Sequence, residues 1–163
     1  MQELENNSIG EGTSIADFVA IHNTEIGCDC QIWRFVNIYG VTIGDECMIG
    51  SFVEIQRDVT IGDRSRIQSH AFICSLVEIG ADVFVSHGAK FVNDRSPPSG
   101  DRDEWESTTI EGGAVIGTNA TLLPVTVGRN ALVGAGAVVT EDVPENAIVA
   151  GNPAEIIGYR DQE

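Results

Sequence analysis

An aliphatic or phenylalanine side chain returns about every six residues along most of this 163-residue chain. These anchor positions run from Ile9 to Phe91 and, after one interruption, from Ile110 to Val139. The residue two places before an anchor is usually small or β-branched, which gives two inward positions in each repeat. An amphipathic helix, with a period of about 3.6 residues, cannot produce this spacing. A short fixed period of this kind predicts a solenoid.

Departures from the six-residue step divide the pattern into coils. Five-residue steps fall at 21–26, 38–43 and 122–127, each after the third anchor of a group of three. Three anchors therefore make one coil, and each coil is expected to supply three short parallel strands around a triangular core. Successive coils would stack at about 4.8 Å, the ordinary spacing between strands. The anchors form about seven coils, grouped as 9/15/21, 26/32/38, 43/49/55, 61/67/73, 79/85/91, 110/116/122 and 127/133/139.

Residues 92–109 interrupt the pattern and cannot continue the prism. The segment is polar, rich in Pro and charge, and contains Trp105 with Arg95 and Arg102. Insertions of this length in a compact domain are uncommon and tend to be functional, although a tolerated surface excursion would look the same in sequence. After Val139 the chain leaves the repeat and is expected to cover the open strand edges at the end of the stack. The sequence predicts one domain over 1–163, with coils at 9–91 and 110–143, a projecting loop at 92–109 and a C-terminal cap at 144–163.

Composition limits the partners of the chain. The net charge is -16, from 25 acidic and 9 basic residues, and this argues against nucleic-acid binding, which needs clustered Lys and Arg. No apolar run approaches the length of a membrane span, and the N-terminus is polar and acidic rather than signal-like. We therefore expect a cytoplasmic protein that makes no membrane contact. The four cysteines lack C-x-x-C spacing, so we expect free thiols and no metal site.

The repeat and the ending of the chain resemble a known superfamily. Residues 142–154 contain the Asp-Val-Pro and Gly-Asn-Pro-Ala motifs that close the hexapeptide-repeat acyltransferases. The resemblance covers 9–157 and implies a single left-handed parallel β-helix, an all-β fold. The hand comes from this resemblance, because periodicity alone does not choose one and crossovers between parallel strands are generally right-handed.

A narrower resemblance indicates a substrate class. Segments 33–38, 52–56, 66–73, 83–88 and 91–95 are similar to nucleotide-sugar N-acetyltransferases, foremost those acting on UDP-2-acetamido-3-amino-2,3-dideoxy-glucuronate and on dTDP-3-amino-hexoses. This implies transfer of an acetyl group from acetyl-CoA to the amino group of a nucleotide-linked sugar, with a 3-amino sugar favoured, for bacterial surface polysaccharide synthesis. The chain departs from the family at Ser86, at Ser96 and after Pro124, and the change at Ser96 leaves the identity of the sugar open.

Three residues are candidates for catalysis. His70 and His87 stand shortly after the middle anchors of the fourth and fifth coils, so they are expected near each other on one outer face beside the loop. The amine is nucleophilic only when neutral, and a histidine can take up the proton that it loses. Attack on the thioester builds an oxyanion, which a backbone N–H between coils can stabilise. Our hypothesis is that Asn93 positions the amine and that His87 or His70 assists; two solvated surface histidines are the alternative.

Binding residues follow from the resemblance and from charge. A planar guanidinium pairs bidentately with phosphate oxygens, so Arg34 is expected at the nucleotide pyrophosphate. Asn37, Gln68 and Asp94 lie in the segments that carry the resemblance and complete the predicted substrate site. Small residues at 134–136 offer a smooth track for the pantetheine arm of acetyl-CoA, although the repeat itself also favours small residues there. The predicted cofactor site comprises Arg129, Gly134, Ala135, Gly136, Asn152, Pro153 and Ala154.

Aromatic residues outside the inward positions predict an oligomer. The interior cannot hold these side chains, so we expect another subunit to bury them. The resembling families form threefold trimers with active sites between chains, which implies a homotrimer. The residues concerned are Trp33, Phe35, Phe52 and Phe72.

Other functions are compatible with the same fold. A metal-dependent lyase of the γ-class carbonic anhydrase type needs three imidazoles on zinc across a subunit boundary, and His22 lies several coils from the other two histidines. An acyltransferase acting on a different small acceptor also stays open. A non-catalytic solenoid would show a regular ladder of identical outward residues, which Thr42, Thr60, Thr121 and Thr126 do not form.

Overall fold

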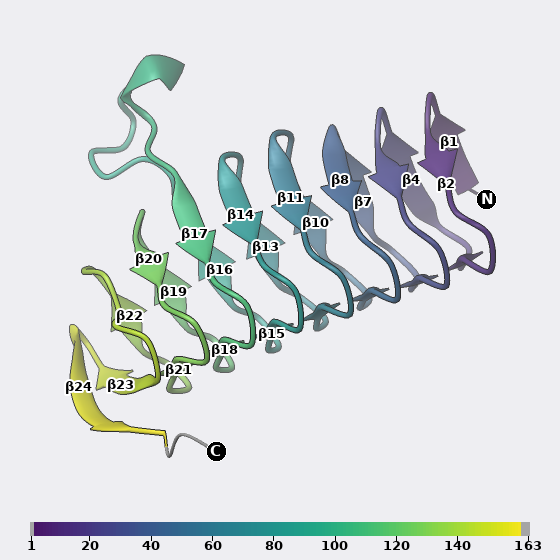
Figure 1. Cartoon of the computed structure of the whole chain (residues 1–163). Helices are drawn as coiled ribbons and strands as arrows, with labels where there is room; N and C mark the ends of the chain where they lie inside the picture. The colour runs from purple at the N-terminus through teal and green to yellow at the C-terminus, as the bar shows by residue number, and fades with distance from the viewer. Residues whose placement is uncertain (1, 161–163) are drawn as a thin grey trace.

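The computed structural model describes residues 2–160, and within them the chain winds as a parallel β-helix (Figure 1). Three sheets form the sides of a triangular prism, and each coil adds one strand to each sheet in turn. The predicted fold class is confirmed, because the protein is all-β, a left-handed β-helix with one long projecting loop. Residues 1 and 161–163, which the predicted domain and cap include, lie outside the described residues.

We name the three sheets A, B and C. Sheet A contains β1 (Gln2–Glu5), β4 (Val19–His22), β7 (Asn37–Tyr39), β10 (Glu54–Ile55), β13 (Phe72–Ile73), β16 (Lys90–Phe91), β19 (Thr121–Leu122) and β22 (Val138–Val139). Sheet B contains β2 (Ser8–Ile9), β5 (Glu25–Ile26), β8 (Val41–Ile43), β11 (Val59–Ile61), β14 (Val77–Ile79), β17 (Thr108–Ile110) and β20 (Thr126–Val127). Sheet C contains β3 (Ser14–Ile15), β6 (Gln31–Ile32), β9 (Met48–Ile49), β12 (Arg66–Ile67), β15 (Phe84–Val85), β18 (Val115–Ile116), β21 (Leu132–Val133), β23 (Ala147–Gly151) and β24 (Ala154–Tyr159).

The predicted groups of anchors coincide with the coils of the described chain. In each group the first anchor lies in sheet B, the second in sheet C and the third in sheet A. The anchors align from coil to coil, as when Ile61 pairs with both Ile43 and Ile79. The strand β1 adds to sheet A ahead of the first coil and was not predicted, because residues 2–5 do not follow the repeat. We number the coils from one, at Ile9, to seven, at Val139.

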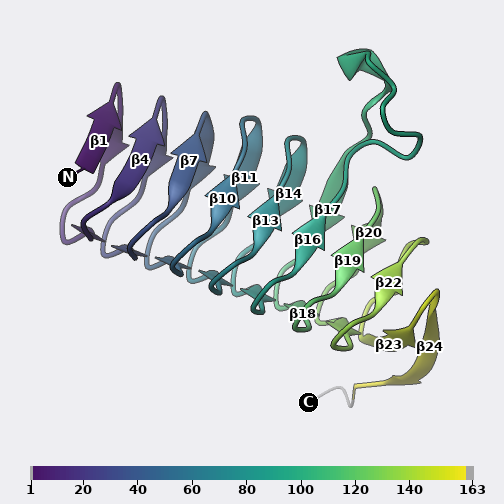
Figure 2. The same cartoon turned by 180° about the vertical axis from the view of Figure 1, so that it is seen from behind.

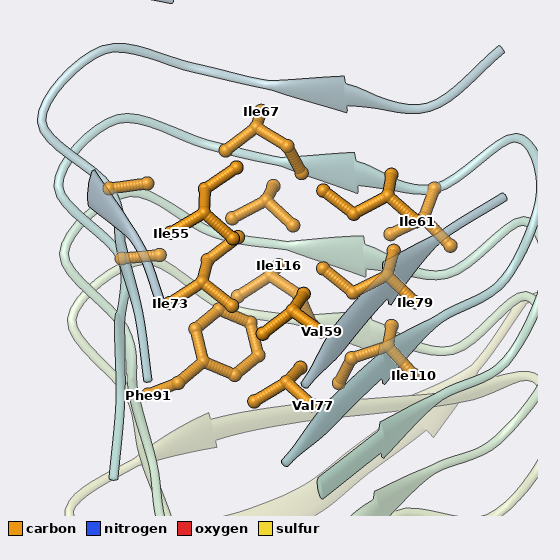
Figure 3. Packing of buried hydrophobic residues seen from close by; sticks show 14 of the residues in the cluster. Ile55, Val59, Ile61, Ile67, Ile73, Val77, Ile79, Phe91, Ile110 and Ile116 are labelled. Atoms are coloured by element: carbon orange, nitrogen blue, oxygen red, sulfur yellow. The ribbon is translucent and has the colours of Figure 1, made fainter. Parts of the chain in front are cut away.

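The anchors and the small inward residues fill the prism. Figure 3 shows Ile55 and Ile73 of sheet A opposite Ile61 and Ile79 of sheet B, with their side chains meeting near the axis. The anchors from coil two onward are buried, and each contributes about 1.5–3 kcal/mol through removal of its side chain from water. The smaller residues two places before them are buried too, as predicted from the pattern. Burial also raises the pKa of the Cys74 thiol to about 12, so this cysteine stays protonated at neutral pH.

Three corners join the sheets, and each is named here by the sheets on either side of it. The chain passes the B/C corner, then the C/A corner, then the A/B corner in every coil. The backbone turns through positive φ at all three corners, for example 59° at Asp82 on the B/C corner, 65° at His70 on the C/A corner and 60° at Asp58 on the A/B corner. Gly, Asn and Asp adopt this left-handed conformation at the least cost.

The inserted loop and the C-terminal hairpin complete the fold. The loop leaves the prism at the A/B corner between β16 and β17, and it stands out from the stack in Figures 1 and 2. It carries a short 3₁₀ helix, η1 (Arg102–Glu104), and β17 begins at Thr108, one residue before the predicted end of the loop. At the C-terminal end β23 pairs with β21, and β24 folds back antiparallel on β23 (Figure 2). Among residues 2–160 the structure contains no helix with the length and apolar character needed to span a bilayer.

Candidate functional site

Several predicted site residues form a column along the C/A corner. Backbone hydrogen bonds of 2.8–3.3 Å link this corner from coil to coil, among them Phe52 N to Arg34 O, Asn119 N to His87 O and Gly136 N to Thr118 O. At about 4.8 Å for each coil, His87 lies about 14 Å along the axis from Arg34 and about 10 Å from Ala135. We call this the C/A column, and its members from coil two to coil seven are Arg34, Ser51, Ser69, His87, Thr118 and Ala135.

A stack of aromatic rings runs beside the C/A column. The ring centroids of Phe18 and Phe35 are 5.5 Å apart, those of Phe35 and Phe52 are 4.9 Å apart, and those of Phe52 and His70 are 4.9 Å apart. We call these four residues the aromatic ladder. Its phenylalanines are 53%, 48% and 51% exposed and hold φ of 61–62°. Because Phe52 covers one face of the His70 imidazole, the ladder fixes the plane of that ring.

Asn93 lies at the neck of the loop, on the A/B corner. Its Nδ2 donates to Ser75 O at 3.2 Å, and its backbone carbonyl accepts from Glu106 N at 2.8 Å. A carbonyl oxygen only accepts hydrogen bonds, so the amide nitrogen of Asn93 must face Ser75. The Oδ1 atom is then directed away from Ser75, where it can accept a hydrogen bond from an amine.

Asp94 anchors the start of the loop. One carboxylate oxygen accepts from Ser99 N at 2.9 Å, and the other accepts from Ser96 N at 2.9 Å. These hydrogen bonds, the one from Ser99 foremost, hold the pKa of Asp94 below its ordinary value. Its contacts in the described chain therefore shape the loop, and a contact with substrate stays a prediction.

The structure separates the candidate histidines from the loop. His70 and His87 share the C/A corner on successive coils, as predicted, and both are exposed. Asn93 stands on the A/B corner, beyond the whole of β16. The expectation that the histidines lie beside the loop of the same chain is wrong, because sheet A lies between them. Asn37, on β7, is half-buried within sheet A between these two corners.

The predicted cofactor residues divide into two groups. Gly134, Ala135 and Gly136 lie on the C/A corner of coil seven, and Gly134 N donates to Val149 O of the next strand at 2.7 Å. Asn152, Pro153 and Ala154 form the turn between β23 and β24, which closes on the same corner. Arg129 lies apart, on the B/C corner, where it lines a shallow hollow of about 370 Å³ with glycines of coils five and six.

Among residues 2–160 no group of three or more His, Cys, Asp or Glu side chains is placed to hold a metal ion. His22 lies on β4 of coil one, where its Nδ1 is 3.5 Å from Glu5 Oε2. It is thus far along the axis from His70 and His87, as the sequence predicted.

Some residues near the site were missed from the sequence. Tyr39 and Arg57 line a groove between the A/B corner and the loop, together with Arg102 and Trp105. In the sequence, only the tryptophan and arginines of the loop indicate a functional site. Tyr39 and Arg57 could not be recognised, because they occupy ordinary corner positions of the repeat. Lys90 was also missed; its Nζ donates to His70 O and places an ammonium beside that histidine. Phe72 was expected to be exposed but is partly buried against the core.

Two family models match the chain. The bacterial transferase hexapeptide (six repeats) matches residues 23–57 and 40–75, and the hexapeptide repeat of succinyl-transferase matches residues 107–141. The two matches cover the coils on both sides of the loop. Both matches identify these coils as hexapeptide repeats of the kind found in bacterial transferases.

A curated relative matches part of this chain. It is the 2,3,4,5-tetrahydropyridine-2,6-dicarboxylate N-acetyltransferase of Staphylococcus aureus, 44% identical over 79 residues. The match covers 48% of this chain and 31% of the relative. The chain thus spans about a third of the length of the curated relatives that it matches.

Solved structures share the fold over most of the chain. The polySia-specific acetyltransferase NeuO aligns with a TM-score of 0.75 and 21% identity, covering 99% of this chain and 88% of NeuO. A variant of AntD, an N-acyltransferase from Bacillus cereus in complex with dTDP-4-amino-4,6-dideoxyglucose and coenzyme A, aligns with a TM-score of 0.63 and 20% identity. That alignment covers 95% of this chain and 84% of AntD. At these identities the likeness shows the fold.

Proposed function

We propose that this acyltransferase transfers the acetyl group of acetyl-CoA to the amino group of a nucleotide-linked sugar, with a 3-amino sugar as the favoured acceptor. We place the enzyme in the cytoplasm, in the synthesis of bacterial surface polysaccharide. The matches to hexapeptide-repeat transferase models support acyl transfer. AntD, which has the same fold, binds both coenzyme A and a nucleotide-linked amino sugar. The sequence segments similar to nucleotide-sugar N-acetyltransferases support the same acceptor class.

The order of side chains along the C/A column carries this proposal. The small residues around Ala135 leave room for a flexible pantetheine arm at the C-terminal end, and Arg34 offers a cation for phosphate at the other end. His87 stands between them, about two coils from Ala135 and three coils from Arg34. A donor lying along the upper coils and an acceptor lying along the lower coils would therefore bring their reacting groups together near His87.

A second chain would complete this arrangement. His87 and Asn93 belong to coil five, and Arg34 and Tyr39 belong to coil two, on opposite corners of sheet A. Rotation about an axis parallel to the prism keeps every residue at its own level. In a threefold trimer, the C/A corner of one chain can face the A/B corner of the next, with His87 level with Asn93. The half-exposed rings of the aromatic ladder supply apolar surface for that contact.

The chemistry at this junction is acyl transfer to nitrogen. Oδ1 of Asn93 accepts a hydrogen bond from the sugar amine and directs the nitrogen lone pair at the thioester carbonyl. The C–N bond forms as the C–S bond breaks, and coenzyme A leaves as the thiol. His87 or His70 takes up the proton that the nitrogen loses. A backbone N–H of the corner stabilises the oxyanion that forms on the carbonyl oxygen.

Acetyl transfer to defined acceptors tests the proposal. We expect thiol release from acetyl-CoA with UDP- or dTDP-linked 3-amino sugars, and none with the matching sugars that carry a hydroxyl instead. Asn93→Ala should lower kcat/KM by about 100-fold, because the amine loses its positioning contact, whereas His22→Ala should leave it unchanged. An enzyme that releases no thiol with any amino sugar, or a monomer in light scattering, would contradict the acceptor or the trimer respectively.

The staphylococcal relative supports a second candidate acceptor. That protein is named for N-acetylation of tetrahydropyridine dicarboxylate, and its match covers nearly half of this chain. The acceptor panel should therefore include tetrahydropyridine-2,6-dicarboxylate. Turnover with this compound and not with amino sugars would favour an enzyme for a small non-nucleotide acceptor.

A further inference from the structure

The inserted loop and the A/B corner enclose a groove of about 270 Å³, which we call the loop groove. Arg102 holds the loop over the corner through an ion pair with Asp58, which lies between β10 and β11. The same guanidinium lies 5.9 Å from the centroid of the Trp105 ring. The residues that line the groove are Tyr39, Gln56, Arg57, Ser75, Arg102 and Trp105.

The charge of the loop groove is opposite to that of the protein. The chain carries 25 acidic and 9 basic residues, yet two arginines and no carboxylate line this groove. Arg102 is neutralised by Asp58, whereas Arg57 has no ion pair or hydrogen bond among the described residues. A guanidinium left without a partner in so acidic a chain is a ready contact for an anion, and phosphate oxygens match its planar donors.

The groove also offers aromatic surface beside the unpaired charge. Tyr39 and Trp105 are both half-buried, so each ring keeps part of its surface open to a ligand. A nucleobase stacks on such a ring, and its polar edge can meet the side-chain amide of Gln56. Binding pockets for whole small molecules usually measure about 300–1,000 Å³. The loop groove is therefore suited to part of a ligand, a base with an adjoining phosphate, and leaves the rest outside.

The groove adjoins the candidate catalytic amide. Ser75 lines the groove, and its carbonyl oxygen accepts the hydrogen bond from Asn93 Nδ2 at 3.2 Å. A ligand that fills the groove would thus extend toward Asn93 at coil five. In a nucleotide-linked sugar the group that follows the base and the phosphates is the sugar, which carries the reacting amine.

We propose that the loop groove binds the nucleoside diphosphate of the acceptor, with Arg57 at the phosphates and Trp105 against the base. The proposal rests on the function proposed above and deepens it by naming residues that select nucleotide-linked acceptors. Arg34, on the opposite corner of coil two, can reach the same ligand only from a neighbouring chain.

Calorimetric titration of the full chain with UDP, and separately with dTDP, in the absence of any acyl donor, tests this assignment. Arg57→Ala should weaken binding of the nucleotide by at least about tenfold, as expected for the loss of a charged hydrogen bond. Arg66→Ala is the matched control, since Arg66 is an exposed arginine on sheet C, outside the groove, and should bind as the wild type does. Trp105→Ala should weaken the binding of UDP or dTDP but not that of inorganic pyrophosphate. Trp105→Phe should restore most of the lost nucleotide affinity.

The outcomes separate this assignment from the proposed function. Equal affinity of Arg57→Ala and the wild type for both nucleotides would overturn it, as would an equal loss in Arg66→Ala. If the wild type binds acetyl-CoA but neither nucleotide, the loop groove is not a nucleotide site, while acyl transfer to a different acceptor stands. If nucleotides bind through Arg57 but no amino sugar is acetylated, the site assignment holds and the proposed reaction fails.

Discussion

The B/C and C/A corners turn the backbone in the same way but carry different side chains. The non-glycine residues with positive φ on the B/C corner include Asp29, Asp82 and Asn130, whereas Phe35 and Phe52 take this conformation on the C/A corner. The left-handed conformation costs roughly 1–2 kcal/mol for residues with a Cβ, and least for Asn and Asp. Folding of one chain accounts for the polar corner. It does not account for half-exposed phenylalanines in this conformation. We infer that a requirement other than the folding of one chain sets the residues of the C/A corner.

Ion pairing also distinguishes the two corners. On the B/C corner, Arg64 Nε lies 2.8 Å from Asp82 Oδ1 and ties coil four to coil five. This hydrogen-bonded pair lowers the pKa of Asp82 and raises that of Arg64. On the C/A corner, Arg34 and His87 have no ion pair or hydrogen bond through their side chains among the described residues. The charges of Arg64 and Asp82 are thus paired within the chain, whereas those of Arg34 and His87 are left available to ligands.

The largest expected effect tests whether catalysis belongs to the C/A corner. We compare three substitutions that each introduce asparagine at a corner: His70→Asn and His87→Asn on the C/A corner, and Asp82→Asn on the B/C corner. We expect at least one of the two histidine changes to lower kcat/KM by about 100-fold or more, through loss of the proton acceptor. Asp82→Asn should leave kcat/KM unchanged in the thiol-release assay. Unchanged turnover in both histidine variants would remove the base assignment.

A core substitution asks whether both corners depend on the same packing. Ile67 is fully buried between the B/C and C/A corners of coil four. Ile67→Ala should lower the free energy of unfolding by about 2–5 kcal/mol, because it removes buried methyl groups and leaves a cavity. Ile67→Val is the control, with an expected loss of about 0.5–1.5 kcal/mol in urea unfolding. An equal loss of unfolding free energy in the two variants would mean that the surrounding core relaxes to fill the cavity left by Ile67→Ala.

Exchanging one corner residue for the type found at the other tests the role of the aromatic ladder. Phe35→Asn relieves the left-handed strain but removes two ring contacts, so the secondary structure should persist. If Phe35 contacts a neighbouring chain in the proposed trimer, loss of its apolar side chain should weaken that trimer by about tenfold. Light scattering on dilution, with circular dichroism as the check on folding, measures both. An assembly as stable as that of the wild type would show that the ladder does not contact another chain.

The smallest expected effect concerns the loop at the remaining corner. Because hydrogen bonds lower the pKa of Asp94, its anchoring contribution is complete above the ordinary pKa of about 3.9 and is lost as the pH falls through the lower folded value. Asp94→Asn mimics the protonated carboxyl at neutral pH. It should increase tryptic cleavage after Arg95 and Arg102 a few-fold, whereas Asp82→Asn should not. Identical cleavage rates in the wild type, Asp94→Asn and Asp82→Asn would contradict an anchoring role for Asp94.

The coil structure followed from the sequence because inward positions repeat at a fixed interval. Each five-residue step marks a return from sheet A to sheet B, so the grouping of anchors could be derived before any coordinates. The same logic placed His70 and His87 on one corner. It did not place the loop, because position along the chain does not show that β16 separates His87 from Asn93.

The loop groove shows where sequence reasoning stopped. Trp105 and Arg102 signalled function by their presence in an insertion, but Tyr39 and Arg57 looked like any other corner residues. Tyr39 and Arg57 line the groove because the ion pair between Arg102 and Asp58 holds the loop over them. Arg102 and Asp58 are 44 residues apart in the chain. Such a contact does not follow the six-residue repeat, so the sequence pattern does not predict it.

By itself the sequence determined the prism, because two inward side chains in every six residues are both buried only when the chain winds around a common core. It also indicated the resemblance to hexapeptide-repeat transferases, since that pattern and the closing motifs are read directly from the chain. Tertiary structure alone decided that the loop and Asn93 lie on a different corner from the two histidines, which rings stack in the aromatic ladder and which arginine stays unpaired beside the loop. These depend on contacts between coils and on the path of an aperiodic insertion, where individual side-chain pairs rather than a repeated pattern set the lowest free energy.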